Sequence, residues 1–532
     1  MLCCCMLNRF LDITAGRWQN PMTNRWGGNM DTAIYERFCR KMAGRALLGE
    51  EVARLLNDLG EQKAEETWTS YAQRALAEGR ITCVRGIGRE RKRSWFGLHT
   101  FNVSCRRCGS GIGSMRATPC AACGQQCLYC EACLGMGRVR SCTPIFIGKT
   151  GPRVSLSNSV PDELTRWGLS RAQASAVRAA LSYLERPDAS QFLIWAVTGA
   201  GKTEMLFPLL ERTVSAGGFA LVATPRQDVV KELQPRLAKA FPGIEVTALY
   251  GGSGSPWDYG QITVATTHQL LRFRHAFDLV VIDELDAFPY LGDPMLHVAA
   301  RQAGKPGAPY IFLSATPPKD MRRAARKGRL PHVKVPARFH GHPLPVPRRV
   351  PWQPPRHSAA RVSRRLARHL SRSLERGAQV FVFVPRIDMV DPLAEALQRA
   401  FPDIRIEGTS SQDEERGEKV MRFRRRETRV LVTTTILERG VTVPKSDVFI
   451  LDASAPLFDE AALVQMAGRA GRSAEDPEGR VLFFSPCWTR SQRAAIRHIR
   501  RMNREAQRKG YLKPKEPGTR AARETPKTDF NK

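Results

Sequence analysis

The sequence predicts an α/β protein with two tandem parallel-sheet domains, preceded by a small Cys-rich zinc-binding domain and a short helical N-terminal region. Short apolar runs alternate with helical stretches in two blocks of similar size, from about residue 169 to 336 and again from 362 onward. This alternation is typical of βαβ units, whose strands pair in parallel. Eight of the fourteen cysteines are clustered ahead of both blocks, between residues 105 and 142.

The length of 532 residues is too great for one core, so several domains are expected. We expect a partly helical region with a disordered start at 1–100, a zinc-binding domain at 101–150, sheet domains at 160–338 and 361–488, a Pro-rich linker at 339–360 and a basic tail at 489–532. The net charge of +32 favours a polyanionic partner, nucleic acid before an anionic membrane. No apolar run is long enough to span a membrane.

The N-terminal region carries two helical patterns. Apolar residues lie on one face between Leu47 and Leu59, and on another between Trp68 and Leu76. The basic run from Arg85 to Phe96 ends in aromatic residues, which suits phosphate contact with base stacking but equally suits a solvated loop.

The clustered cysteines include two Cys-x-x-Cys-Gly turns, which are typical of structural Zn²⁺ sites with four thiolates. A catalytic zinc is not expected, because such sites leave no open coordination position. The number of thiols exceeds the need of one ion, so either two ions bind or several thiols are spare.

Strands are expected in the first block at 192–197, 219–223, 262–265, 279–283 and 310–314, with a helix at 226–240. The first strand leads into Gly199-Ala-Gly201-Lys202-Thr203, which has the form of a phosphate-binding loop although Ala196 replaces the glycine of the strict pattern. Lys202 would reach the β- and γ-phosphates, and the Thr203 hydroxyl would ligate Mg²⁺.

Two carboxylates follow the apolar strand that ends near residue 283. Asp283 is suited to hold Mg²⁺ and Glu284 to orient the attacking water. Ser314-Ala-Thr316 follows another strand as a hydroxyl-bearing turn near the γ-phosphate.

In the second block, strands are expected near 379–384, 404–406, 429–433, 447–451 and 480–484, and helical potential extends over 489–508. Gln465-Met-Ala-Gly-Arg469-Ala-Gly-Arg472 places two arginines three residues apart, which predicts one helical face. Arginines offered by a second domain stabilise charge in phosphoryl transfer.

Together these motifs resemble superfamily 2 helicases and translocases, which implies two RecA-like domains and an ATP hydrolase that depends on DNA. Leu169-Ser-Arg-Ala-Gln173 looks like the adenine-reading motif, and the segments at 224–226, 266–269, 283–286, 314–316, 381–385, 433–442 and 465–472 look like later motifs. The implied nucleotide-binding residues are Gln173, Thr198, Gly199, Ala200, Gly201, Lys202, Thr203, Glu204, Asp283 and Gly440. The implied catalytic residues are Lys202, Asp283, Glu284, Gln465, Arg469 and Arg472, and the expected DNA contacts are Thr224, Arg226, Thr266, Thr267 and Thr434.

A narrower resemblance rests on Asp283-Glu-Leu-Asp-Ala-Phe-Pro289 and Thr435-Ile-Leu-Glu-Arg-Gly-Val-Thr442, which are similar to the ComFA family of late competence proteins. PriA restart helicases are cousins, but their cysteine ribbon is inserted in the second motor half. Tyr129 to Val139 also resembles the ComFA segment that closes a four-cysteine site. By that resemblance Cys105, Cys108, Cys130 and Cys133 are the first-choice zinc ligands, and Cys120, Cys123 and Cys127 remain for an alternative pairing or a second site.

The ComFA resemblance implies a cytoplasmic ATPase, stimulated by single-stranded DNA, that works at the inner face of the membrane and helps to draw in transforming DNA. Its implied partners are the phosphoribosyltransferase-like protein ComFC, the DNA-processing protein DprA and the uptake channel. Two alternatives stay open at this point: a PriA-like 3'-5' restart helicase, and a zinc-bearing DNA-binding adaptor that uses ATP only to switch affinity.

Overall fold

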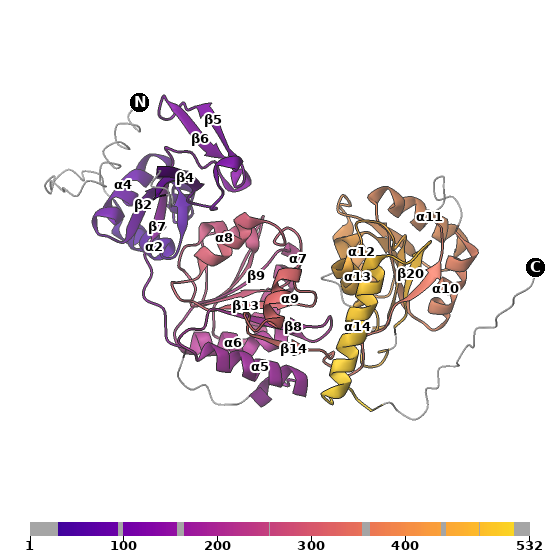
Figure 1. Cartoon of the computed structure of the whole chain (residues 1–532). Helices are drawn as coiled ribbons and strands as arrows, with labels where there is room; N and C mark the ends of the chain where they lie inside the picture. Colours follow the sequence, from indigo (N-terminus) through magenta and orange to yellow (C-terminus); the bar gives the residue numbers. More distant parts are fainter. Residues whose placement is uncertain are drawn as a thin grey trace, which may run out of the picture. The chain divides into compact units, whose positions relative to one another are not determined.

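Two parallel sheets form the larger part of the chain (Figure 1). The computed structural model describes residues 30–93, 99–156, 164–254, 256–353, 362–437, 443–477 and 479–514. The chain divides into two compact units, one that holds the N-terminal part with the first sheet and one that holds the second sheet. The expected disordered start and Gly440 lie outside the described residues.

The N-terminal part packs three helices against a small antiparallel sheet. The helices are α2 (Thr32–Met42), α3 (Gly49–Asp58) and α4 (Ala64–Ala77), one more than the two patterns predict. The sheet has the order β1-β7-β2, with β1 at Ala46–Leu48, β7 at Pro144–Gly148 and β2 at Ile81–Arg85. Apolar side chains of all three helices share one core with Phe146 of β7.

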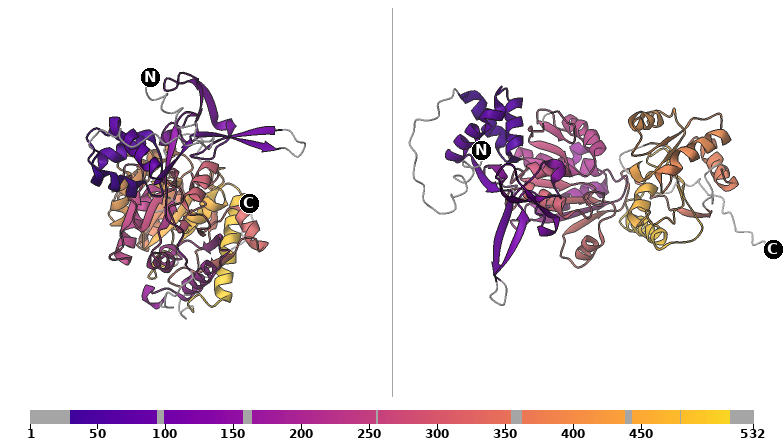
Figure 2. Two further views of the ribbon diagram at one scale, coloured as in Figure 1. Left: turned by 90° about the vertical axis from the view of Figure 1, so that its left-hand side faces the viewer. Right: turned by 90° about the horizontal axis from the view of Figure 1, so that it is seen from above.

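Two hairpins follow β2. Strands β3 (Ile87–Arg93) and β4 (His99–Cys105) form an antiparallel ribbon that projects from the N-terminal part (Figure 2). The basic run is therefore largely strand and not a loop, and its residues Ser94 to Phe96 lie outside the described part. Strands β5 (Met115–Pro119) and β6 (Gln126–Cys130) form the second hairpin, flanked by the short 3₁₀ turns η2 (Ile112–Ser114) and η3 (Leu134–Met136).

The first large sheet has seven strands in the order β10-β11-β9-β12-β13-β8-β14. The five expected strands are confirmed as β8 (Gln191–Ala196), β9 (Ala220–Thr224), β11 (Ile262–Thr266), β12 (Leu279–Ile282) and β13 (Tyr310–Ser314). The sequence pattern missed β10 (Val246–Leu249) and β14 (His332–Val335) at the two edges. The helical elements of this domain are η4 (Leu164–Trp167), α5 (Arg171–Leu184), α6 (Lys202–Ser215), α7 (Gln227–Ala240), η5 (Thr267–Arg272), α8 (Pro294–Ala303) and α9 (Lys319–Arg326).

The second large sheet has six strands in the order β15-β20-β19-β16-β18-β17. Its strands are β15 (Arg348–Pro351), β16 (Gln379–Phe383), β17 (Ile406–Thr409), β18 (Val430–Thr433), β19 (Ser446–Leu451) and β20 (Val481–Ser485). The helical elements are α10 (Arg364–Glu375), η6 (Ile387–Met389), α11 (Val390–Ala400), α12 (Arg416–Arg424), η7 (Thr435–Leu437), α13 (Glu460–Ala467) and α14 (Arg490–Arg508). Aliphatic and aromatic residues of the central strands and of α10 and α11 fill the core between them.

Two expectations about this half of the chain need correction. The stretch 339–360 is not only a linker, because β15 lies within it and pairs in parallel with β20. An edge strand tolerates the proline that ends β15. The region after residue 489 is not simply a basic tail, because α14 buries Ala495, Ile499 and Met502 and packs against α13. Its predicted helical potential is confirmed.

Among the residues that the structure describes, every helix is too short or too polar to cross a bilayer.

Candidate ATP site, nucleic-acid contacts and cysteine clusters

The phosphate-binding loop connects β8 to α6. Gly199 and Gly201 both adopt positive φ, 75° and 71°, which side chains disfavour. A Cβ on Gly201 would lie 2.3 Å from Nε2 of Gln173, so a side chain at this position would displace the Gln173 amide. Gln173 Nε2 donates to the carbonyl of Gly201 at 3.1 Å. The predicted adenine-reading glutamine therefore also fixes the loop at the start of α6, where helical N–H groups favour anions.

Lys202, Thr203 and Glu204 form the first turn of α6 and are half-buried. Arg236 of α7 pairs with Glu204, and its Nη1 lies 3.4 Å from Oγ1 of Thr203. The Thr203 hydroxyl is thus held by a cation in this structure, and Mg²⁺ ligation would replace that contact. Upstream, Thr198 is buried, and its hydroxyl has no hydrogen-bond partner among the described residues.

The predicted carboxylates lie directly after β12, between β9 and β13. Asp283 is buried, and the N–H of Glu284 donates to Asp283 Oδ1 at 2.8 Å. Glu284 adopts a positive φ of 54°, which turns the chain sharply at the strand end. Burial raises the pKa of Asp283 to about 6; the charge of Lys202 opposes this shift, and that of Glu284 adds to it. Lys202 is therefore close enough to act on Asp283 electrostatically.

Asp286 links this strand end to the hydroxyl turn after β13. Ser314 Oγ donates to Asp286 Oδ1 at 2.5 Å, and Thr316 Oγ1 donates to Oδ2 at 2.6 Å. The N–H of Thr316 also donates to Ser314 Oγ at 2.9 Å. Both hydroxyls of the turn thus donate to a carboxylate two residues from Glu284, so a shift of the turn would also displace the segment that carries this predicted catalytic residue.

The predicted arginine face of the second domain is wrong. Helix α13 ends at Ala467, and Arg469 and Arg472 follow it in irregular chain. Gly468 caps the helix and Gly471 adopts a φ of 62°, so the chain turns away before the second arginine. Gln465, on α13, and Arg469 are buried, and Arg472 is half-buried.

Arg338 fixes this turn and was missed by sequence reasoning. Its side chain is 1% exposed, and Nη2 donates to the carbonyl of Ala470 at 2.8 Å while Nη1 donates to that of Gly471. The two carbonyls lie between Arg469 and Arg472. Nothing in the Pro-rich stretch around Arg338 distinguishes it from the other arginines there.

The expected DNA contacts of the first domain lie on neighbouring strands. Thr224 ends β9 and Thr266 ends β11, and their Cα atoms are partners in the parallel register. Thr267 begins η5. The hydroxyls of Thr224 and Thr267 are buried and have no hydrogen-bond partner among the described residues. Arg226, in contrast, forms a two-pronged contact with Asp228, at 2.7 and 3.1 Å.

In the second domain, Thr434 follows β18 and is buried. The predicted nucleotide contact Gly440 lies outside the described residues.

Comparison with known proteins identifies the family. The chain is 40% identical over 432 residues to Competence protein ComFA of Bacillus subtilis (strain 168), covering 80% of this chain and 89% of that protein. It is 37% identical over 409 residues to Competence protein ComFA of Streptococcus pneumoniae (strain ATCC BAA-255 / R6), covering 76% of this chain and 90% of that protein. The chain belongs to the ComFA family of competence proteins.

Three family models match this ComFA chain in succession. They describe a competence protein ComFA N-terminal domain at 32–147, a DEAD/DEAH box helicase at 170–324 and a helicase conserved C-terminal domain at 362–474. The protein is thus a helicase-like, ATP-hydrolysing motor of superfamily 2, and ATP with Mg²⁺ follows from the DEAD/DEAH box domain. Solved structures of similar fold include the DEAD-box helicase Mss116 bound to ssRNA and UDP-BeF, with a TM-score of 0.48 at 17% identity over 63% of this chain and 76% of that one.

The ComFA N-terminal match includes all eight clustered cysteines, which form two quartets. The Sγ atoms of the first-choice quartet, Cys105, Cys108, Cys130 and Cys133, all lie within 4.8 Å of one another. Cys105 and Cys133 are 3.9 Å apart, and Cys108 and Cys130 are 3.6 Å apart. Four thiolates around Zn²⁺, each at about 2.3 Å, would be spaced by about 3.8 Å. These buried residues therefore fit a structural zinc ion.

Cys120, Cys123 and Cys127 meet in a second quartet whose fourth member is Cys142. Sequence reasoning counted Cys142 in the cluster but did not name it as a ligand. The antiparallel bridge between Tyr129 and Arg140 returns the chain alongside β6 and brings Cys142 to this quartet.

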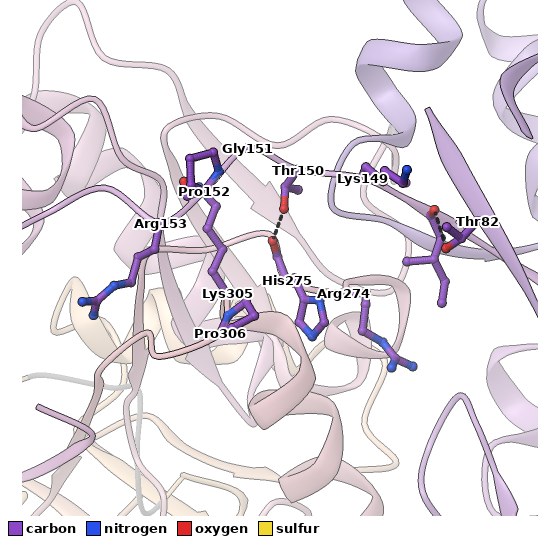
Figure 3. A pocket seen from close by; sticks show the side chains of 12 residues that line it. Thr82, Lys149, Thr150, Gly151, Pro152, Arg153, Arg274, His275, Lys305 and Pro306 are labelled. Carbon is purple, nitrogen blue, oxygen red and sulfur yellow. Dashed lines mark hydrogen bonds between the residues drawn. The ribbon is translucent and has the colours of Figure 1, made fainter. Parts of the chain in front are cut away.

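A basic cavity of about 510 Å³ lies between the N-terminal part of this ComFA chain and its first sheet domain (Figure 3). Lys149, Arg153, Arg274 and Lys305 line it, and none of its lining residues is acidic. Lys305 is paired with the buried Asp278 at 3.0 Å, so the other three cations dominate the charge of the cavity. The positive charge of this lining favours the binding of an anion.

Proposed function

We propose that this protein is an ATP-driven translocase on single-stranded DNA, which draws transforming DNA into the cytoplasm during competence. The observation that carries the proposal is a shared strand edge. Asp283 follows β12, and Thr224 and Thr266 end the next two strands, β9 and β11. Parallel strands place their carboxyl ends at one edge of the sheet, where ligands bind. The proposed magnesium ligand Asp283 and the proposed DNA contacts are therefore neighbours in one sheet.

The proposed nucleotide site uses residues of both sheet domains. Lys202 and the loop N–H groups would bind phosphate oxygens, while Thr203 and Asp283 would hold Mg²⁺. Glu284 would orient and polarise the attacking water, and Arg469 and Arg472 of the second domain would stabilise the charge that develops. Hydrolysis of the bond between the β- and γ-phosphates of Mg-bound ATP would drive the translocation cycle.

The proposed DNA site reads the backbone and not the bases. Hydroxyl groups of Thr224, Thr266, Thr267 and Thr434 can donate to phosphates of any sequence. Thr224 and Thr267 are fully buried with no hydrogen-bond partner for their hydroxyls among the described residues, so they would have to be uncovered before they could donate to a phosphate. Arg226 would join them only after it leaves Asp228. The basic cavity lined by Arg274 offers a further phosphate contact outside the strand edge.

A translocase test separates this proposal from its alternatives. With a streptavidin block on a biotinylated single strand, we expect ATP-dependent displacement of the block without separation of a forked duplex. Efficient unwinding of the fork would instead favour a restart helicase. DNA affinity that changes with nucleotide, without any displacement, would favour an adaptor.

The competence setting is proposed from the family. The partners would be ComFC, DprA and the uptake channel, with the protein at the inner face of the cell membrane. Co-purification of the full-length protein with tagged ComFC from competent cells would test the first of these contacts, and failure to co-purify under mild conditions would count against it.

A further inference from the structure

We propose that Cys120, Cys123, Cys127 and Cys142 bind a second Zn²⁺ ion, so that the Cys-rich segment holds two ions with separate ligand sets. This site does not depend on the proposed motor function. It would fasten the β5–β6 hairpin to the chain that leads into β7.

The spacing of the four sulfur atoms supports metal binding. All four lie within 4.8 Å of one another. Cys120 and Cys142 are 3.7 Å apart, and Cys123 and Cys127 are 3.3 Å apart. These distances are close to the roughly 3.8 Å edge of a zinc–thiolate tetrahedron. They are well above the disulfide length of about 2.05 Å.

The turn that carries Cys120 and Cys123 repeats the geometry of the first-quartet turn. The N–H of Gly124 donates to the carbonyl of Cys120 at 2.8 Å, as that of Gly109 does to Cys105 at 2.7 Å. Both glycines adopt positive φ, 69° and 76°. In each turn the first cysteine N–H also donates to the carbonyl five residues on, Gln125 and Ser110 respectively, at 2.9 Å. Because the two cysteine turns have the same backbone geometry, we expect each to bind its own ion.

The two quartets cannot share one ion. Cys127 and Cys130 lie on the same strand, β6, and belong to different quartets. Three residues of extended strand separate their Cα atoms by about 10 Å, and an odd separation directs their side chains to opposite faces. Each end of β6 therefore contributes one thiolate to its own site.

The fourth ligand explains what the ion would hold together. Cys142 follows Ser141, whose N–H donates to the carbonyl of Leu128 in β6 at 2.8 Å, and it lies two residues before β7. Strand β7 is the central strand of the sheet beneath the N-terminal helices. The second ion would thus tie the hairpin turn to that sheet. Cys123 and Cys142 are partly exposed, whereas all four first-quartet cysteines are buried, so a chelator should reach the second ion first.

Metal analysis of the full-length protein tests the proposal. We expect two Zn²⁺ per chain, released by a chelator in a fast and a slow phase. Cys142→Ser should contain one ion and lose only the fast phase, while Cys83→Ser, a control outside both quartets, should keep two. Cys142→His should restore the second ion, since imidazole is also a zinc ligand; this rescue separates lost ligation from misfolding.

Two results would overturn the proposal. One is two ions in Cys142→Ser with both release phases unchanged. The other is one ion in the native protein together with only ten of the fourteen thiols titratable after denaturation, which would mean that the quartet forms two disulfides.

Discussion

Arg107 Nη2 lies 2.9 and 3.0 Å from the two carboxylate oxygens of Glu51, and both side chains are almost fully buried. Arg107 stands between two cysteines of the first quartet, and Glu51 belongs to α3. Arg272 at the end of η5 donates to the same carboxylate at 2.8 Å. One buried carboxylate therefore joins the cysteine turn, the N-terminal helices and the segment that begins with the proposed DNA contact Thr267.

Replacing the carboxylate of Glu51 should destabilise the first unit strongly. Glu51→Gln leaves Arg107 and Arg272 with a buried charge and no anion, which typically costs about 3–5 kcal/mol. We expect the first thermal unfolding transition to move down by several degrees. Glu50→Gln, on the same helix but with an 80% exposed side chain, should leave it within about 0.5 kcal/mol. Equal effects of both substitutions would contradict this role.

Arg338 should control the turn that carries the two arginines of the second domain. Arg338→Ala leaves the carbonyls of Ala470 and Gly471 without their donors, so Arg469 and Arg472 lose their fixed positions. We expect kcat for ATP to fall at least about tenfold with little change in KM, because the arginines act mainly on the transition state.

Two control variants test whether the effect depends on the guanidinium of Arg338 itself. Arg338→Lys should recover activity only in part, since one ammonium cannot replace a two-pronged guanidinium. The exposed Arg348→Ala should be neutral. Normal ATP turnover by Arg338→Ala would contradict the proposal that Arg338 positions Arg469 and Arg472.

Asp283 should make nucleotide binding depend on pH. Its pKa is raised from 3.8 to about 6, so the folded chain keeps this proton to higher pH than the unfolded chain. Its contribution to the free energy of unfolding is therefore greatest at low pH and declines as pH rises through about 6. Because Mg²⁺ needs the ionised carboxylate, Mg-dependent ATP affinity should change the other way, weakening about tenfold from pH 7.5 to pH 5.

Calorimetric titration at several pH values, with and without Mg²⁺, measures this dependence. Asp283→Asn should abolish the part of the ATP affinity that depends on Mg²⁺. It should also raise the stability of the nucleotide-free protein at neutral pH. An unchanged pH profile in this variant would assign the titration to another group.

Gly201→Ala should abolish nucleotide binding without unfolding the chain. The new Cβ would collide with Gln173, whose amide fixes the loop. Gly217 is a matched control, because it also has positive φ but no atom within 4 Å of a Cβ. Gly217→Ala should cost about 1 kcal/mol of stability and leave ATP affinity unchanged. ATP binding by Gly201→Ala at native affinity would contradict the assigned loop geometry.

The sequence predicted the elements that have strong local patterns. The central strands are largely apolar because both faces are buried, and the segments at their carboxyl ends carried the motif residues. The strands β10, β14 and β15 at the sheet edges were missed. Each has only four residues, some of them polar or proline, so no hydrophobic periodicity can be detected in it. The end of α13 depends on backbone angles at Gly468 and Gly471. Arg338 and Cys142 act through contacts distant in sequence, which no local pattern encodes.

ATP turnover of the full-length protein, with and without single-stranded DNA, examines the motor site most directly. We predict stimulation of about tenfold by single-stranded DNA in the native protein. Turnover should fall by about 100-fold or more in Lys202→Ala and in Glu284→Gln, with ATP binding lost in the first and retained in the second. Turnover at the native rate in either variant, or no response of the native enzyme to single-stranded DNA, would contradict the proposed translocase.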